Sequence, residues 1–351
     1  MGNKILLIAI FSILHSYLGA QSPLFAVVRP DGTTYICPTW DSAYNRATDG
    51  DNIYLPGGTI SFANLAVSKR LYIYGSGHHP DSTIATGITT IAGNFSVLKG
   101  ADQGSVEGLN ITSHIYFGSG LSNNNRANIQ GYTIKRCRVS NIVLNNSTNP
   151  NTAFPDSLPS NLAIYESVFS QLYATYGNSH NISLSKNIIT SVVQSVRFTS
   201  FNNNIFLAGP GTPIPVINCS FVNNIFCSGS TFNQCSSSFY NNLKVGSSNF
   251  LTGCAPGDGS QSGNISVASV SDIFIFYNGS GFLYSDNYHL KPTCPGINGG
   301  TDGTDVGIYG TISPVAEGWV PSNPHIYFKQ VAPSTNSTGQ LPVQFKVRTN
   351  N

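Results

Sequence analysis

A six-residue pattern that recurs through the middle of the chain restricts its fold more than any other sequence feature. The pattern reads apolar, two variable residues, a small polar residue, one variable residue, apolar, and its clearest copies are FNNNIF (201–206), FVNNIF (221–226) and FYNNLK (239–244). Less regular copies lie at 106–111, 134–139, 164–169 and 184–189. The small polar position is filled in successive copies by Cys137, Ser167, Asn187, Asn204, Asn224 and Asn242. The copies recur about every 20 residues, with one longer step that contains the insertion NNSTNPNTAFPDSLPS.

This spacing predicts a parallel β-solenoid. Each repeat contains Gly, Asn and Ser turns and strand-length apolar alternation, whereas a helical repeat needs a longer apolar periodicity. In a parallel solenoid, equivalent positions stack about 4.8 Å apart, so each repeated apolar position forms an inward column. We expect one column from Phe201, Phe221 and Phe239, and another from Ile189, Phe206 and Phe226.

The repeated asparagine predicts a second kind of column. Asparagine tolerates the left-handed backbone of a sharp corner, and its amide can bond to the residues above and below it. We therefore expect an asparagine ladder at Asn187, Asn204, Asn224 and Asn242.

Composition also favours an all-β chain. Only 9% of the residues are charged, and turn and strand formers are plentiful while Lys, Glu and Ala are scarce. The formal net charge of +2 provides no basic field for nucleic acid or an anionic membrane, so we expect neither partner. The seven cysteines have no CxxC spacing, which indicates neither a zinc site nor a redox motif. We expect most of these cysteines to be buried and unpaired.

The first 20 residues have the order of a secretory signal. Lys4 precedes an apolar run from Ile5 to Leu14, and the small residues Gly19 and Ala20 follow. This run is too short to cross a bilayer, and no later stretch approaches the roughly 20 apolar residues of a transmembrane helix. We expect the mature chain to be secreted or held at the cell surface.

The segments that flank the repeats resemble a known superfamily. Trp40, Ala43, Tyr44 and Ala47 recur at helical spacing, which predicts a short helix that caps the solenoid. DGDNIYLPGGTI (49–60) follows, and this order of helix, GD pair, apolar strand and Pro-Gly turn is similar to the entry of right-handed parallel β-helix proteins of the pectate-lyase and polygalacturonase type.

Two further segments extend the resemblance over about residues 25 to 310. RLYIYGSGHHPDST (70–83) and NYHLKPTCPGINGGTDGTDVGIYG (287–310) look like segments of secreted bacterial β-helix proteins of mostly unassigned activity. The resemblance implies an all-β fold, a single-stranded right-handed parallel β-helix. It is specific for the fold and much less so for function.

The chain therefore divides into four parts: a signal peptide (1–20), an N-terminal strand with the capping helix (21–52), the parallel β-helix of about ten coils (53–292), and a C-terminal cap (293–351). Near the C-terminus, HIYFKQV and LPVQFKV are separated by a turn and predict a β hairpin. One face of the second strand is apolar and needs cover. We expect this hairpin to seal the last coil; the alternative is a sorting or adhesion tail.

Catalytic residues are not evident. Enzymes of the superfamily use acidic clusters, with calcium in the lyases and paired Asp in the hydrolases, and those motifs are absent here. Between residues 105 and 250 the acids are Glu107, Asp156 and Glu166, which form no evident acid–base pair. We assign no catalytic residue, no metal site and no cofactor; calcium is expected only if the chain is a lyase.

The third position of the repeat gives the best polar constellation. It places Arg136, Glu166 and Lys186 on successive coils, and Arg138 and Arg197 add positive charge nearby. One interpretation is a surface salt-bridge ladder, contributing at most about 1 kcal/mol per pair. The other is a glycan-binding face, on which tyrosines stack against sugar rings. The tyrosines next to this column that we expect to bind are Tyr165, Tyr173 and Tyr176.

Two functions are consistent with these observations. The first is an exported monomer that binds polysaccharide or a cell-surface glycan, preferably an anionic one, without catalysis. The second is a polysaccharide lyase or glycoside hydrolase. The missing acidic clusters favour binding over catalysis, whereas the superfamily resemblance keeps the enzyme as the alternative.

Overall fold

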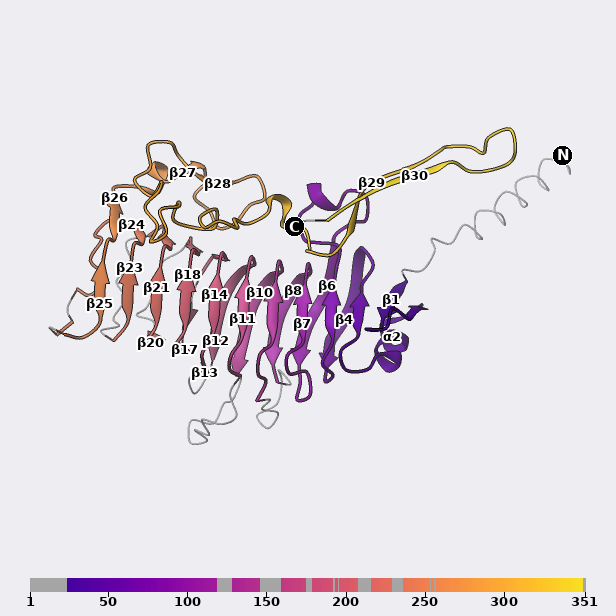
Figure 1. The fold of residues 1–351 in the computed structure, drawn as a ribbon, viewed down its shortest axis with the longest axis horizontal. Coiled ribbons are helices and arrows are strands. Elements are labelled where there is room, and N and C mark those ends of the chain that lie inside the picture. The colour runs from indigo at the N-terminus through magenta and orange to yellow at the C-terminus, as the bar shows by residue number, and fades with distance from the viewer. Residues whose placement is uncertain are drawn as a thin grey trace, which may run out of the picture.

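The computed structural model describes residues 24–118, 128–145, 159–174, 179–191, 193–194, 196–207, 216–228, 236–252, 254–255 and 257–349. Within these residues the protein is mostly β-strand, and two long sheets run along its length (Figure 1). The expected signal peptide lies outside the described residues. No helix in the described part of the chain is both long and apolar enough to span a bilayer.

The first long sheet is parallel from β3 onward. Its strands, in spatial order, are β2 (Thr34–Cys37), β1 (Phe25–Val28), β3 (Asn52–Tyr54), β5 (Tyr72–Tyr74), β7 (Ser105–Glu107), β9 (Thr133–Lys135), β11 (Ala163–Tyr165), β14 (Ser183–Ser185), β18 (Ser200–Asn202), β21 (Ser220–Val222), β23 (Ser238–Tyr240) and β25 (Ser260–Ser262).

The second long sheet is parallel throughout. Its strands, in spatial order, are β26 (Ile265–Val267), β24 (Leu243–Val245), β22 (Ile225–Phe226), β19 (Ile205–Phe206), β15 (Ile188–Ile189), β12 (Val168–Ala174), β10 (Arg138–Asn145), β8 (Asn110–Phe117), β6 (Thr89–Val97) and β4 (Gly58–Val67), and β16 (Val193–Gln194) also pairs with β12. A third, short sheet contains β13 (Ser179–His180), β17 (Val196–Arg197) and β20 (Val216–Ile217).

The chain alternates between the two long sheets, so each strand pairs with the strand one repeat away. This path is consistent with a β-solenoid. The last strands of the long sheets end at Ser262 and Val267, before the expected boundary at residue 292.

Short elements lie at the ends of the long sheets. The described helices are α2 (Trp40–Arg46) and the 3₁₀ turns η1 (Asp81–Thr83), η3 (Val270–Asp272) and η4 (Glu317–Trp319). Two antiparallel pairs follow the coils, β27 (Phe274–Phe276) with β28 (Asn287–Leu290) and β29 (His325–Val331) with β30 (Val343–Arg348).

Helix α2 forms where the sequence predicts a helix. A capping box between Thr39 and Ser42 satisfies its first N–H groups, and Trp40 and Ala43 are buried. Trp40 lies edge-to-face with Phe25 of β1, with the ring centroids 6.4 Å apart. The helix therefore packs at the N-terminal end of the first sheet (Figure 1).

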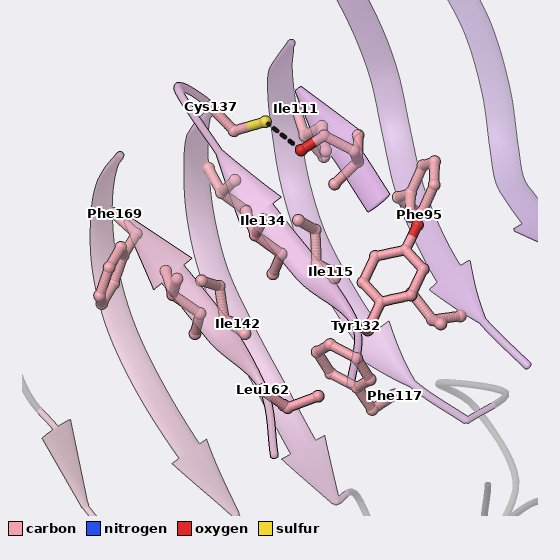
Figure 2. Packing of buried hydrophobic residues seen from close by; sticks show 14 of the residues in the cluster. Phe95, Ile111, Ile115, Phe117, Tyr132, Ile134, Cys137, Ile142, Leu162 and Phe169 are labelled. Carbon is pink, nitrogen blue, oxygen red and sulfur yellow. Dashed lines mark hydrogen bonds between the residues drawn. The ribbon is translucent and has the colours of Figure 1, made fainter. Parts of the chain in front are cut away.

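Inward side chains fill the space between the sheets. Phe221 stacks on Phe201 and on Phe239, with centroid distances of 4.4 and 4.8 Å, and Phe206 stacks on Phe226 at 4.6 Å. In the N-terminal half this core is mainly aliphatic, and Figure 2 shows Ile111, Ile115, Ile134 and Ile142 pointing into it. The inward columns lie as the repeat predicts because strand residues on one face recur at every second position.

The asparagine ladder is continuous. The Oδ1 atom of Asn204 accepts from the backbone N–H of Asn187 at 2.9 Å and from its side-chain amide at 3.0 Å, and Asn224 and Asn242 repeat this geometry on the next coils. The ladder extends one rung further than expected, to Asn264.

The prediction that the ladder asparagines take up the left-handed backbone of the corner is wrong. The left-handed residues of this corner are the preceding ones, with φ of 56° at Asn203 and 57° at Asn223. The four expected ladder asparagines are held by hydrogen bonds instead, since all four, Asn187, Asn204, Asn224 and Asn242, are completely buried.

Five described cysteines are free, and most of them are buried: Cys37, Cys137, Cys219, Cys227 and Cys294. The thiol of Cys137 lies 3.7 Å from the carbonyl oxygen of Val106 (Figure 2). Burial raises the pKa of the Cys137 thiol to about 12 and that of the Cys219 thiol to about 11. Cys254 is in a disulfide. Burial rather than cross-linking therefore accounts for most of the cysteines.

The C-terminal hairpin forms, but the prediction that it seals the last coil is wrong. Just before β29, Ser322 bonds to Glu107 on an early coil, and Figure 1 shows the hairpin extending past the N-terminal end of the sheets, far from β25 and β26. Strand β30 is exposed throughout, including Val343, Phe345 and Val347. The apolar face that the sequence shows is thus left uncovered.

Candidate functional site

The predicted binding column occupies one corner of the solenoid. Arg136, Glu166 and Lys186 all have left-handed backbone, with φ of 48°, 50° and 56°, and the corner continues through Asn203 and Asn223. Each of the three directly follows a strand, β9, β11 or β14, and these strands pair in register on successive coils. The three charged residues therefore stack on one another. The structure therefore brings together Arg136, Glu166 and Lys186 as the repeat predicts.

The opposite charges of this column pair with one another in a buried position. Arg136 Nε donates to Glu166 Oε2 at 2.5 Å, and its Nη1 lies 3.8 Å from Glu107 Oε1. Lys135 Nζ lies 3.8 Å from the same Glu107 oxygen. Arg136 and Glu166 are each 8% exposed, so they form a buried ion pair rather than the surface ladder considered from the sequence. Such a pair needs further hydrogen bonds to offset its desolvation.

Those hydrogen bonds come from a C-terminal segment, residues 294–322, which we call the strap. The strap runs along the column from the last coils toward the first. Its carbonyl oxygens accept from Asn241 at Gly299, from Asn203 at Gly307, from Lys186 at Ser313 and from Arg136 at Val320. At its end, the backbone N–H of Ser322 donates to Glu107 at 2.7 Å.

The column is therefore occupied by the protein's own chain. Arg136 and Glu166 have no open surface for a glycan, and Lys186 is held by the strap, where partial burial lowers the pKa of its ammonium group. Tyr165 lies beside this column, with Lys135 Nζ 5.4 Å from its ring centroid. Tyr176 lies outside the described residues.

The strap also covers an apolar row that the sequence analysis missed. The copies at 164–169, 184–189, 201–206 and 221–226 end in two consecutive apolar residues, and in a strand only one of the two can face inward. The outward row comprises Val168, Ile188, Ile205, Ile225 and Leu243, which are buried beneath Val306, Ile308, Val315 and Trp319 of the strap and beneath Phe274 and Tyr288. The doubled apolar residue was the available signal, because an outward apolar row requires a covering segment.

An open groove of about 430 Å³ lies where this row turns polar. It crosses the first residues of β8, β10 and β12 on the outer face of the second sheet. The polar lining comprises Asn110, Thr112, Arg138, Ser140, Ser170 and Thr190, and the loop before β28 contributes Phe282. Among these lining residues the charged one is Arg138, which is exposed.

Aromatic side chains hold the wall of the groove. The Arg138 guanidinium lies 5.7 Å from the ring centroid of Phe282 and 5.2 Å from that of Tyr284, as in a cation–π contact. The Tyr284 hydroxyl donates to the carbonyl oxygen of His78 at 2.7 Å. These contacts fix the loop above Arg138, and the Arg138 side chain lines the groove.

The imidazole of His78 anchors this loop from below. It is fully buried, its Nδ1 lies 3.0 Å from the Tyr284 hydroxyl, and its ring is 5.7 Å from that of Trp319. Burial, with a contribution from nearby Arg138, lowers the pKa of His78 to about 3. His78 is therefore neutral near neutral pH and acts as a fixed support.

A row of flat side chains continues the same outer face. Val143 pairs with Tyr116 on one side and Tyr173 on the other, and the three are adjacent in sequence to the inward residues Ile142, Ile115 and Leu172, so they face outward. The Tyr116 ring stacks on His114, with centroids 5.2 Å apart and planes 7° apart, and His114 Nε2 lies 3.1 Å from the Asn141 amide. Of the predicted binding tyrosines, Tyr173 thus lies on the outer face of the second sheet, where it is partly buried.

Comparison with known proteins gives no family for the chain. No family model matches it, and no curated protein matches it significantly.

Proposed function

We propose that the chain is an exported, right-handed parallel β-helix protein, similar to the pectate-lyase and polygalacturonase superfamily, which binds polysaccharide or a cell-surface glycan without cleaving it. The handedness follows from the rule that crossovers between parallel strands are right-handed. In this proposal residues 1–20 direct export and helix α2 closes the N-terminal end of the solenoid.

The observation that carries the proposal is the open polar groove with an aromatic wall. Its hydroxyl groups recur on neighbouring strands, at Thr112, Ser140 and Ser170, and strands in a sheet are spaced about 4.8 Å apart. A linear glycan can therefore meet equivalent groups on β8, β10 and β12, and each contact need only be weak. The flat rings of Tyr116 and Tyr173 extend the face on which sugars can stack.

The positions of the acids support binding rather than cleavage. Hydrolysis of a glycosidic bond needs two carboxyl groups on either side of it. Glu107 and Glu166 are engaged by Ser322 and Arg136 beneath the strap, and neither lines the groove. Arg138 gives the groove a positive charge, which favours an anionic glycan.

The test is a titration of the mature protein with uronic-acid and neutral polysaccharides, with and without calcium, by calorimetry. We expect Arg138→Ala to weaken binding of the acidic polysaccharide about tenfold, because it removes charge-assisted hydrogen bonds. The matched control is Lys99→Ala, which removes the same charge from an exposed turn after β6 and should leave affinity unchanged.

Lys186→Ala separates this site from the covered column, and it should also leave affinity unchanged. Affinity that survives Arg138→Ala, or falls only in Lys186→Ala, would refute the groove. New unsaturated or reducing ends in the same samples would show a lyase or a hydrolase and overturn the non-catalytic assignment.

A further inference from the structure

The last coil of the solenoid ends in two unpaired strand edges. β25 is the last strand of the first sheet and β26 is the last strand of the second, at the end opposite α2 in Figure 1. Ser260, Gln261 and Ser262 are all exposed. The hairpin that the sequence predicts at this end lies elsewhere, so nothing within the described residues pairs with these edges.

The register shows which backbone groups face outward. Ser260 N–H donates to Ser237 and the carbonyl oxygen of Ser262 accepts from Asn241, so both residues face β23. In a parallel ladder the intervening residue directs its N–H and C=O groups to the other side, which here is the free side at Gln261.

The same reasoning applies to β26. The N–H of Ile265 donates to Asn242, and the carbonyl oxygen of Val267 accepts from Gly246, which leaves the backbone of Ser266 facing outward. Asn264, between the two strands, is the last rung of the ladder in the described chain.

The interior of this end is closed, but its surface is polar. Phe250 stacks on Phe239 at 4.6 Å and ends the aromatic column, and its backbone N–H donates to the side-chain Oε1 of Gln261. A shallow hollow of about 270 Å³ lies beside the edge, lined by Ser248, Asn249, Gln261, Ser262 and Asn264. None of these lining side chains is charged.

We propose that this end is a homodimer interface, at which two copies of the chain pair tail to tail. The outward backbone of Gln261 and that of Ser266 each present one N–H donor and one C=O acceptor, so the edge is complementary to a second copy of itself. Sheet edges that remain single are usually protected by charge or proline, and β25 and β26 contain neither.

A two-fold axis through the Gly263–Asn264 corner satisfies both edges at once. It places β25 of each copy against β26 of the other, with the strands antiparallel, and so continues both long sheets across the interface. This contact is isologous and closes at two copies, so it gives a dimer rather than a filament. A dimer differs from the monomer expected from the sequence, and the oligomeric state decides between the two.

The two-stranded sheet of β29 and β30 also has free edges, but its positive charge disfavours contact between two copies there. Lys329, Lys346 and Arg348 lie on β29 and β30, and residues 318–351 contain no Asp or Glu. Two hairpins brought edge to edge would repel each other, whereas β25 and β26 contain no charged residue.

Sedimentation equilibrium of the full mature chain over a wide concentration range tests the interface. The wild type should approach twice the mass of one chain. Ser266→Pro removes only an outward N–H, so it should raise the dissociation constant at least about tenfold, which is the loss of one net hydrogen bond on each copy. Ser266→Ala keeps the backbone and should dimerise as the wild type does.

Ser262→Lys provides an independent variant, because it places a like charge at the rim of both copies. Circular dichroism and the urea midpoint establish that each variant folds. A wild type that stays monomeric at all concentrations, or a dimer that neither Ser266→Pro nor Ser262→Lys weakens, would overturn the proposal.

Discussion

Removing one rung of the asparagine ladder should destabilise the protein far more than an ordinary polar substitution. In the ladder, Asn224 makes four hydrogen bonds through its side chain: Oδ1 accepts two from Asn204 at 2.9 Å each, and Nδ2 donates to Phe201 at 2.8 Å and to Asn242 at 3.0 Å. The amide is completely buried.

Asn224→Ala leaves two buried donors of Asn204, one from its backbone and one from its side chain, without an acceptor. Each unsatisfied buried group costs about 1–3 kcal/mol. Asn242 keeps the bond from the backbone N–H of Asn224, so the acceptors lose less. We therefore expect the free energy of unfolding to fall by about 3–5 kcal/mol.

Urea unfolding followed by circular dichroism measures this loss, and hydrogen exchange locates it on the coils of Asn204 and Asn242. Asn45→Ala, at an exposed position of α2, is the matched control and should change stability by less than about 0.5 kcal/mol. Asn204→Ala combined with Asn224→Ala should cost less than the sum of the two, because they share orphaned partners. A loss below about 1 kcal/mol, or strict additivity, would refute the ladder's role.

Three further predictions concern the core, the cysteines and the hairpin. Burial lowers the pKa of Lys244, whose Nζ lies 4.6 Å from the Phe250 ring, so the unfolded chain binds more protons than the folded one between the lowered pKa and the usual value. The free energy of unfolding should therefore rise with pH across that window. Urea titrations at several alkaline pH values measure this rise, and Lys244→Met should abolish it. Thiol titration in denaturant should count the five free cysteines, whereas the native protein should react slowly because Cys137 and Cys219 are buried with raised pKa values; a count of one would contradict this. Truncation after Ser322 should change the unfolding free energy by less than about 1 kcal/mol, since β30 is exposed throughout, and a larger loss would show that the hairpin covers part of the fold.

Short-range periodicity in the sequence was sufficient for the interior of the solenoid. The Phe201, Phe221 and Phe239 column and the Asn204 and Asn224 rungs follow from a strand that places every second residue inward and from a repeat that stacks equivalent positions. These contacts join equivalent positions of neighbouring repeats, so aligning the repeats in the sequence fixes them all.

What lies on the outside of the coils was decided by the tertiary structure. Arg136 meets the carbonyl oxygen of Val320 across 184 residues of sequence, and Ser322 meets Glu107 across 215. No periodicity links such distant segments, and the same stacked Arg136 and Glu166 are compatible with an open face or a covered one. Only the return of the chain along the solenoid buries them. The strap covers the outward apolar row, which ends at Val168, so Arg138 on the neighbouring strand stays exposed in the groove.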